Sequence, residues 1–406
     1  MTTEPISTAT TVLAMAQAER FAELREMFAP QLRDTVSAEA LQLAWTAELG
    51  RRGRITAIGT PIGEPAGPGT VAVKIPVSFE QGAMTVIVAV VGSGALAGLQ
   101  LVPAGAAEPI APWAPPAYAD PRTFDEQDVA LGSGPLAVPA ALSLPRQPVP
   151  SPAVVLLGGS GPAGRDETIG RNKRLKDLAW GLAGRGIAVL RFDNVTVAHP
   201  GEVGHNPDFT VIDEYLHHAV AAIHLLRQHP AVDATRIFLL GHSLGGTVAP
   251  RVAAAEPVVA GLVILAGGTQ PLHWAAVRQV SYLASLEPGG AAASQSVVDA
   301  MSRQAEMVES AELSASTPAT ELPFGVPAAY WLDLRGYHPV ELAATLGKPI
   351  LVLQGGRDYQ VTVADDLARW RAGLADNPEV SFRVYDRDNP MFFPGSGTIG
   401  RVLTCH

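Results

Sequence analysis

The pattern of apolar and polar positions in the first hundred residues predicts helices followed by strands. A helical period runs through residues 12–28, and a second helical stretch extends over residues 37–49. Apolar and polar side chains then alternate strictly over residues 71–79, and after a Gln-Gly turn residues 84–91 form the predicted returning strand. We therefore expect a small α+β domain at residues 1–105.

The chain beyond this domain has a different pattern. Residues 106–122 are proline-rich and predict a semi-rigid linker. Short apolar runs then alternate with helical patterns, which predicts a doubly wound, mostly parallel sheet within residues 123–406. The predicted strands are residues 153–157, 187–192, 237–240, 262–266, 350–353 and 380–385. The interval at about 267–347 is longer than one crossover helix needs, so we expect a helical lid with an apolar wall there.

Composition and charge narrow the class of protein. The 406 residues are 47% hydrophobic and 17% charged, which is typical of a folded globular enzyme. The net charge of −10 leaves no basic surface for nucleic acid, so we expect no nucleic-acid partner. The lone cysteine, Cys405, excludes a disulfide within the chain and a thiolate metal cluster.

Membrane and cofactor signals are missing from the sequence. No apolar run reaches the roughly 18 residues needed to cross a bilayer, and the N-terminus lacks the basic and apolar regions of a signal peptide. We therefore expect a cytoplasmic protein that does not bind membranes. No histidine pair has metal-ligand spacing beside a carboxylate, so neither a metal nor another cofactor is predicted. No pattern points to an oligomeric state.

The segment Gly241-His-Ser-Leu-Gly-Gly246 carries the first candidate chemistry. It follows a predicted strand and leads into a helical stretch, which is the context of a nucleophile elbow. Flanking glycines allow a tight turn that presents the hydroxyl of Ser243 at a helix N-terminus. The alternative is a strand-to-helix turn that only packs closely, but the strand before and the helix after favour a nucleophile.

A second glycine-rich turn, Gly158-Gly-Ser-Gly-Pro162, directly follows an apolar strand. The backbone amides of Ser160 and Leu244 are therefore candidate donors of an oxyanion hole. The segment can also be an ordinary glycine turn or a phosphate cradle, although the Lys and Ser/Thr of a P-loop are absent. Asp166 and Glu167 follow it and either order this loop or lie in a solvated turn.

Asp358 comes in a glycine-rich loop directly after the predicted strand at residues 350–353. An acid that follows the serine in the chain fits the order of a serine, acid and histidine triad on a doubly wound sheet. Taken alone, an aspartate in such a turn often only binds its own backbone. The neighbouring Arg357 is expected to form an ion pair or to orient the loop.

With these motifs, residues 124–397 resemble the two-domain bacterial serine esterases of the α/β-hydrolase superfamily. The matching motifs are Gly159-Ser-Gly-Pro162, Arg165-Asp-Glu-Thr-Ile-Gly170, Gly241-His-Ser-Leu-Gly-Gly246, Tyr330-Trp-Leu-Asp-Leu-Arg335 and Leu353-Gln-Gly-Gly-Arg-Asp358. The resemblance implies an α/β-hydrolase fold preceded by a small α+β domain. It also implies carboxylic-ester hydrolysis through an acyl-enzyme on Ser243, with Asp358 as the acid and a small-molecule ester as substrate.

Two positions depart from the pattern of this family. Gly158 stands where the family usually has a histidine, a change that leaves the backbone donors in place. Pro390 stands where the family has its catalytic histidine, and a proline ring has no proton to exchange. Related enzymes continue into a closing helix, whereas this sequence ends at His406, shortly after Phe393.

Other histidines are the alternatives for the missing base. His406 can swing back from the chain end, and His242 beside Ser243 is expected to pack away from the site. A helix is expected to hold His217, His218 and His224 as structural or exposed side chains. Predicted loops and the lid hold His199, His205, His273 and His338, where substrate contact is open.

The leading hypothesis is a serine carboxylesterase whose turnover is weak or lost because the triad is incomplete. A second hypothesis is an inactive protein of the same fold that binds an ester or acyl ligand. A third is a non-hydrolytic enzyme that uses the same pocket.

Overall fold

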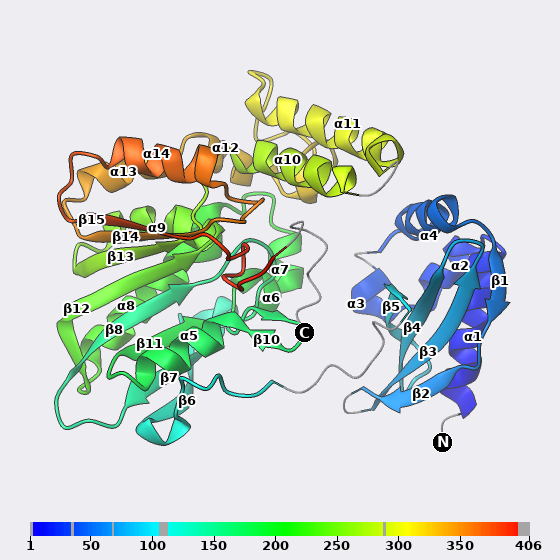
Figure 1. The fold of residues 1–406 in the computed structure, drawn as a ribbon, viewed down its shortest axis with the longest axis horizontal. Helices are drawn as coiled ribbons and strands as arrows, with labels where there is room; N and C mark the ends of the chain where they lie inside the picture. Colours follow the sequence, from blue (N-terminus) through cyan, green and yellow to red (C-terminus); the bar gives the residue numbers. More distant parts are fainter. Residues whose placement is uncertain (1–2, 34–35, 67–68, 105–112, 287–289, 397–406) are drawn as a thin grey trace. The chain divides into compact units, whose positions relative to one another are not determined.

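The computed structural model describes residues 3–33, 36–66, 69–104, 113–286 and 290–396. The chain forms two compact units, residues 1–111 and residues 112–406, each of which has its own core (Figure 1). No helix within the described ranges is long and apolar enough to cross a membrane.

Unit 1 contains an antiparallel sheet covered by helices. The helices are α1 (Thr3–Gln17), α2 (Phe21–Glu26), α3 (Pro30–Arg33) and α4 (Ala38–Arg52). The strands are β1 (Ile55–Ile58), β2 (Ile62–Pro65), β3 (Thr70–Phe79), β4 (Ala83–Val91) and β5 (Leu96–Pro103), in the order β1-β3-β4-β5 with β2 also paired to β3. Alternate residues of β3 and β4 are buried against Leu13, Phe21 and Leu24 of the helices.

The first predicted helix is interrupted in the structure. Glu19 has a φ of 56°, which ends α1 before α2 begins. The apolar period continues across this break because Leu13, Phe21 and Leu24 all reach the same core. The turn at Glu19 contains no glycine or proline that would signal the end of a helix. The apolar pattern therefore predicted one continuous helix.

Unit 2 has a mixed sheet in the order β15-β14-β13-β12-β8-β11-β7-β6. Its strands are β6 (Phe124–Leu131), β7 (Val138–Pro145), β8 (Ser151–Leu157), β11 (Ala188–Phe192), β12 (Val232–His242), β13 (Val259–Leu265), β14 (Ile350–Gly355) and β15 (Val380–Tyr385). The pairs from β11 to β15 are parallel, and β7 and β6 add to β11 as antiparallel strands. The predicted α/β fold with a mostly parallel sheet is confirmed.

Sequence analysis missed β6 and β7. Half of the residues of β6 are polar and exposed, because this strand forms the edge of the sheet. The buried residues of β7 include three successive small or apolar side chains and Ser143, and Pro139 interrupts the strand pattern. Neither strand therefore has the continuous apolar run of a strand that is buried on both faces.

Helices cover both faces of the sheet. On one face, α5 (Arg174–Ala183) packs on β11 and β7. On the other face, α8 (His217–Gln228) and α9 (Leu244–Ala255) pack on β12. The short β9 (Thr168–Ile169) and β10 (Asn172–Lys173) form a ribbon before α5. Since the parallel strands share one direction, their carboxyl ends lie at one edge, where the loops with the candidate motifs gather.

The long interval between β13 and β14 is helical. It contains α10 (Leu272–Ser285), α11 (Gly290–Glu309), α12 (Ala328–Arg335) and α13 (Pro339–Thr345), and α10 lies beside α11 (Figure 1). Shorter helices α6 (Val195–Ala198), α7 (Pro200–Gly204) and α14 (Ala368–Gly373) complete the unit, with π-helical turns at Ile212–Leu216 and Val363–Leu367.

One buried carboxylate holds the start of this interval to the π-helical turn at Val363–Leu367. Asp366, which is 1% exposed, accepts hydrogen bonds from the amides of Thr269 at 2.8 Å, Gln270 at 3.1 Å and Thr362 at 2.9 Å. Nearby, Trp370 Nε1 donates to the carbonyl of Gly267 at 2.8 Å.

We predict that Asp366→Ala lowers the free energy of unfolding of unit 2 by roughly 3 kcal/mol, because it leaves buried amide donors without acceptors. The neighbouring Asp365, whose side chain is 50% exposed, provides the matched control, and Asp365→Ala is expected to cost less than about 1 kcal/mol. Urea unfolding followed by fluorescence measures both. Equal losses in the two variants would contradict this account of Asp366.

Candidate active site

Ser243 lies at a strained turn between β12 and α9. Its φ of 53° and ψ of −120° are unusual for a residue other than glycine, and α9 begins at the next residue. The Ser243 amide donates to the carbonyl of Leu265 at 2.9 Å, which fixes the turn to the end of β13. The side chain of Ser243 is partly exposed and lines both cavities described below.

Glycines make this turn possible because other backbone atoms come very close to them. A Cβ on Gly241 would lie 2.2 Å from the Gly245 carbonyl oxygen, and a Cβ on Gly245 would lie 2.4 Å from the Leu157 carbonyl oxygen. Real Cβ atoms essentially never approach so closely. The helix N-terminus therefore packs directly against the ends of β8 and β12.

The glycine-rich turn after β8 lies against Ser243. A Cβ on Gly159 would lie 3.4 Å from Ser243 Cβ, and the Gly159 carbonyl accepts a hydrogen bond from the Tyr215 hydroxyl at 2.8 Å. Among the described residues, the amides of Ser160 and Leu244 donate to no protein acceptor. Two backbone donors therefore remain available beside the serine, one of them at the N-terminus of α9.

Glu167 connects the two turns. This residue is 5% exposed, so the interpretation as a solvated turn is wrong for it. Its carboxylate accepts from the Gly159 amide at 2.5 Å and pairs with His242 Nδ1 at 3.2 Å and with Arg174 Nη2 at 3.2 Å. Burial raises the pKa of Glu167, but the charge and hydrogen bond of His242, the charge of Arg174 and the Gly159 amide outweigh it and lower this pKa to about 2.

Asp166 has different partners. Its carboxylate binds Lys173 Nζ at 2.9 Å and the buried Arg191 at 3.0 Å. It therefore ties the ribbon before α5 to strand β11.

Asp358 is buried at the end of β14 and is 7% exposed. Its Oδ1 accepts from the amides of Gln360 at 2.8 Å and Val361 at 2.9 Å, and its Oδ2 accepts from Gln354 Nε2 at 3.1 Å. Burial raises the pKa of Asp358 to about 6, and these donors only partly offset the effect. Within the described part of the chain, no histidine side chain donates to this carboxylate.

Pro390 lies in the loop that follows β15, and this loop packs on the end of β14. A Cβ on Gly355 would lie 2.7 Å from the carbonyl oxygens of both Asp388 and Asn389. The Pro390 carbonyl accepts a hydrogen bond from His242 Nε2 at 3.2 Å. Both ring nitrogens of His242 thus have partners, Glu167 on one side and Pro390 on the other, which agrees with its expected orientation away from the serine.

Several other histidines bind groups outside the elbow. His199 and His218 contact the carbonyls of Ala137 and Leu136, each at 2.8 Å. His224 pairs with Glu256 at 2.8 Å, and His273 pairs with Glu309 at 3.5 Å.

Three further histidines of the described ranges are exposed. His205 Nδ1 contacts the carbonyl of Gly201 at 2.6 Å. His217 pairs with Asp213 at 3.5 Å. His338 lines the larger cavity, whereas His406 lies outside the described residues.

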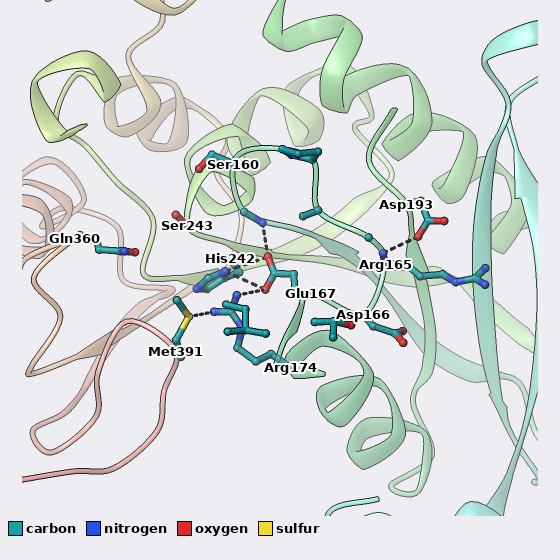
Figure 2. A pocket seen from close by; sticks show the side chains of 16 residues that line it. Ser160, Arg165, Asp166, Glu167, Arg174, Asp193, His242, Ser243, Gln360 and Met391 are labelled. Atoms are coloured by element: carbon teal, nitrogen blue, oxygen red, sulfur yellow. Dashed lines mark hydrogen bonds and ion pairs between the residues drawn. The ribbon is translucent and has the colours of Figure 1, made fainter. Parts of the chain in front are cut away.

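Two cavities meet at Ser243. The smaller cavity, of about 630 Å³, is lined by charged side chains that include Glu167 and Arg174. The larger cavity, of about 950 Å³, extends beneath the helices between β13 and β14. Figure 2 shows the smaller cavity, with Ser160 and Ser243 on one side and the group formed by Glu167, His242 and Arg174 below them. Ser160, Ser243 and Gln360 line both cavities.

Sequence analysis did not identify Arg174, Glu214, Gln360 or Met391 as lining residues of these cavities. None of them belongs to a motif with a known spacing, and Glu214 lies within a stretch with a helical pattern. Among the described residues, no cluster of three or more His, Cys, Asp or Glu side chains has the geometry of a metal site.

The chain is similar to known hydrolases in sequence. A family model described as serine aminopeptidase S33 matches residues 164–387. The chain is 34% identical to esterase EstD of Thermotoga maritima over 319 residues, 79% of this chain and 71% of the relative. It is 28% identical to 2,6-dihydropseudooxynicotine hydrolase of Paenarthrobacter nicotinovorans over 139 residues, 34% of each chain.

Among solved structures, Est1E of Butyrivibrio proteoclasticus has a TM-score of 0.45 and 16% identity, over 65% of this chain and 90% of that one. The matched family range contains Ser243 and Asp358 but not Ser160 or Pro390.

We predict that Glu167→Gln weakens the pH dependence of stability. The folded pKa of Glu167 is depressed, so its contribution is present above its unfolded pKa of about 4.5 and is lost as the pH falls toward about 2. The variant should lose about 3 kcal/mol of unfolding free energy at pH 7 and show a shallower decline between pH values of roughly 5 and 3. Denaturant unfolding at several pH values measures this, with the exposed Glu202→Gln as control. Parallel curves for wild type and Glu167→Gln would refute the assignment.

Proposed function

Since the chain belongs to the S33 serine aminopeptidase family and has the α/β-hydrolase fold, we propose that it is a carboxylic-ester hydrolase with Ser243 as its nucleophile. The observation that carries this proposal is the strained turn at Ser243, which presents a partly exposed hydroxyl where two cavities meet. The name of the relative EstD supports an ester as the substrate.

In the proposed reaction, Ser243 attacks the ester carbonyl carbon and forms an acyl-enzyme, which water then hydrolyses. The developing oxyanion accepts hydrogen bonds from the amides of Ser160 and Leu244. Tyr215 and Glu167 hold Gly159 from opposite sides, so the first of these donors is fixed before substrate binds. The N-terminal dipole of α9 favours the same negative charge.

The proposed mechanism needs a base that takes the proton of the Ser243 hydroxyl. Asp358 is the proposed acid, but Pro390 replaces the histidine that such an acid would orient. His242 is the nearest histidine in sequence, and both of its nitrogens are already bound. We therefore propose an impaired esterase, in which oxyanion stabilisation and substrate positioning supply most of the remaining acceleration.

The helical segment at about 267–347 is the proposed lid, and it provides apolar walls to the larger cavity. Leu272, Ala276 and Val326 are among these wall residues, which suits an acyl or alcohol group of small or medium size.

Pro390 also favours a second candidate function, an inactive protein of this fold that binds an ester or acyl ligand. Such a protein would use the same cavities without turnover.

We predict that Pro390→His raises the turnover of p-nitrophenyl butyrate by at least about 100-fold, because the proposed mechanism would then have a general base for the Ser243 hydroxyl. Ser243→Ala is expected to abolish the hydrolysis of both wild type and Pro390→His. Release of p-nitrophenol, followed as initial rates, measures these values.

Pro390→Asn provides the matched control, because asparagine fits a similar space but cannot take a proton. The double variant Pro390→His with Asp358→Asn should lose most of the gain if Asp358 orients the new histidine. Equal rates for Pro390→His and Pro390→Asn would contradict the assignment of this position. Wild-type rates that equal those of Ser243→Ala, with an active Pro390→His, would favour the second candidate function.

A further inference from the structure

The larger cavity contains a buried carboxyl group that the proposed mechanism does not use. Glu214 is 3% exposed, yet it lines this cavity together with Ser243. Its Oε1 accepts from Asn194 Nδ2 at 3.1 Å, and its Oε2 accepts from the Tyr330 hydroxyl at 2.5 Å. A carboxylate offers about four acceptor positions, so protein donors fill only part of this capacity.

The charge of Glu214 also has no protein counterpart. Among the described residues, no lysine, arginine or histidine forms an ion pair with it. Burial raises the pKa of Glu214 to about 7, although the hydrogen bonds from Tyr330 and Asn194 oppose this rise. A hydrogen-bond donor inside the cavity could therefore bind the carboxylate of Glu214, whose acceptor positions are only partly filled by protein donors.

Trp331, which follows Tyr330 on α12, adds an independent observation. Its side chain is fully buried and lines the same cavity, and in the described part of the chain its Nε1 donor has no hydrogen-bond partner. Buried donors in native proteins nearly always have partners, so an orphaned one points to a missing water or ligand. The wall therefore offers an unfilled acceptor at Glu214 and an unfilled donor at Trp331.

The chemistry of these two groups narrows the class of ligand. A hydroxyl both donates and accepts hydrogen bonds, whereas an ammonium only donates and a carboxylate only accepts. A ligand carboxylate would in addition be repelled by ionised Glu214. A hydroxyl is thus the smallest neutral group that can bind both Glu214 and Trp331.

We propose that Glu214 and Trp331 form a recognition site for substrate hydroxyl groups, so that the preferred ester carries a hydroxyl on the part held in the larger cavity. This inference rests on the proposed esterase function, because it assigns the substrate class of that same site. The hydroxyl belongs to the acyl group or to the alcohol of the ester, and the experiment separates these two sources.

The test compares kcat/KM for matched pairs of esters. On the acyl side the pair is p-nitrophenyl butyrate and p-nitrophenyl 3-hydroxybutyrate, and on the alcohol side it is propyl butyrate and 2,3-dihydroxypropyl butyrate. Wild type should prefer the hydroxylated ester by at least about tenfold in one pair. Glu214→Gln and Trp331→Phe should each lower this preference at least about threefold.

Glu309→Gln is the matched control, since Glu309 lines the same cavity but its side chain is 52% exposed. This variant should keep the full preference. Thermal unfolding followed by circular dichroism verifies that Glu214→Gln and Trp331→Phe are folded at the assay temperature.

Failure of this inference is distinguishable from failure of the proposed function. If wild type shows no preference in either pair while Ser243→Ala abolishes all turnover, the esterase proposal stands and the hydroxyl site is wrong. If wild type hydrolyses none of the esters, binding of the same pairs to Ser243→Ala, measured by tryptophan fluorescence, decides the inference. Binding of a hydroxylated ester about tenfold more tightly supports it, and equal binding overturns it.

Discussion

The close approach of the α9 N-terminus to the ends of β8 and β12 is the constraint on which the candidate site depends. Gly245 packs on the carbonyl of Leu157 with no space for a side chain, and Gly241 packs equally closely on Gly245. This contact brings the loop after β8 against the turn at Ser243. It thereby brings the backbone after β8 and the N-terminus of α9 close to the hydroxyl of Ser243 through backbone contacts. The strain at Ser243 persists because the parallel sheet on one side and α9 on the other leave no room to relax.

Charged groups beneath this turn keep the arrangement rigid. Glu167 binds the loop after β8 through Gly159 and the elbow through His242, and His242 in turn binds the loop after β15 through the Pro390 carbonyl. Three segments that are distant in sequence thus share one buried hydrogen-bond network. Removing a member leaves buried polar groups without partners, which costs more than the lost bond itself.

The parts of this protein that were predictable from sequence are those whose pattern reflects a local constraint. The glycines around Ser243 indicate that backbone segments approach one another closely there. Continuous apolar runs predict strands that are buried on both faces. β6 escaped prediction because an edge strand needs no such run, and the turn at Glu19 escaped because tertiary packing of Leu13 and Phe21 continues across it. The partners of Glu167 and the position of Glu214 in a cavity depend on contacts between distant segments, which no local pattern records.

The surroundings of the buried acids Glu167 and Asp358 show how the proline at position 390 affects the candidate site. His242, Arg174 and the Gly159 amide all act on Glu167, and its pKa falls to about 2 in spite of burial. Asp358 is buried to a similar degree and accepts comparable hydrogen bonds, yet its pKa rises to about 6. The hydrogen bonds to Asp358 come from neutral donors, and the charge of His242 lowers its pKa only slightly. Arg174 and His242 pair directly with Glu167. In the complete triad that the family resemblance implies, the acid stabilises a histidinium that forms during the reaction, whereas the neutral Pro390 offers no such charge to the carboxylate of Asp358. Because the pKa of Asp358 is raised above its ordinary value of 3.8, ionisation of this acid lowers the stability of the folded state as the pH rises from about 4 through about 6. A buried acid that carries such a cost is a candidate for a functional role.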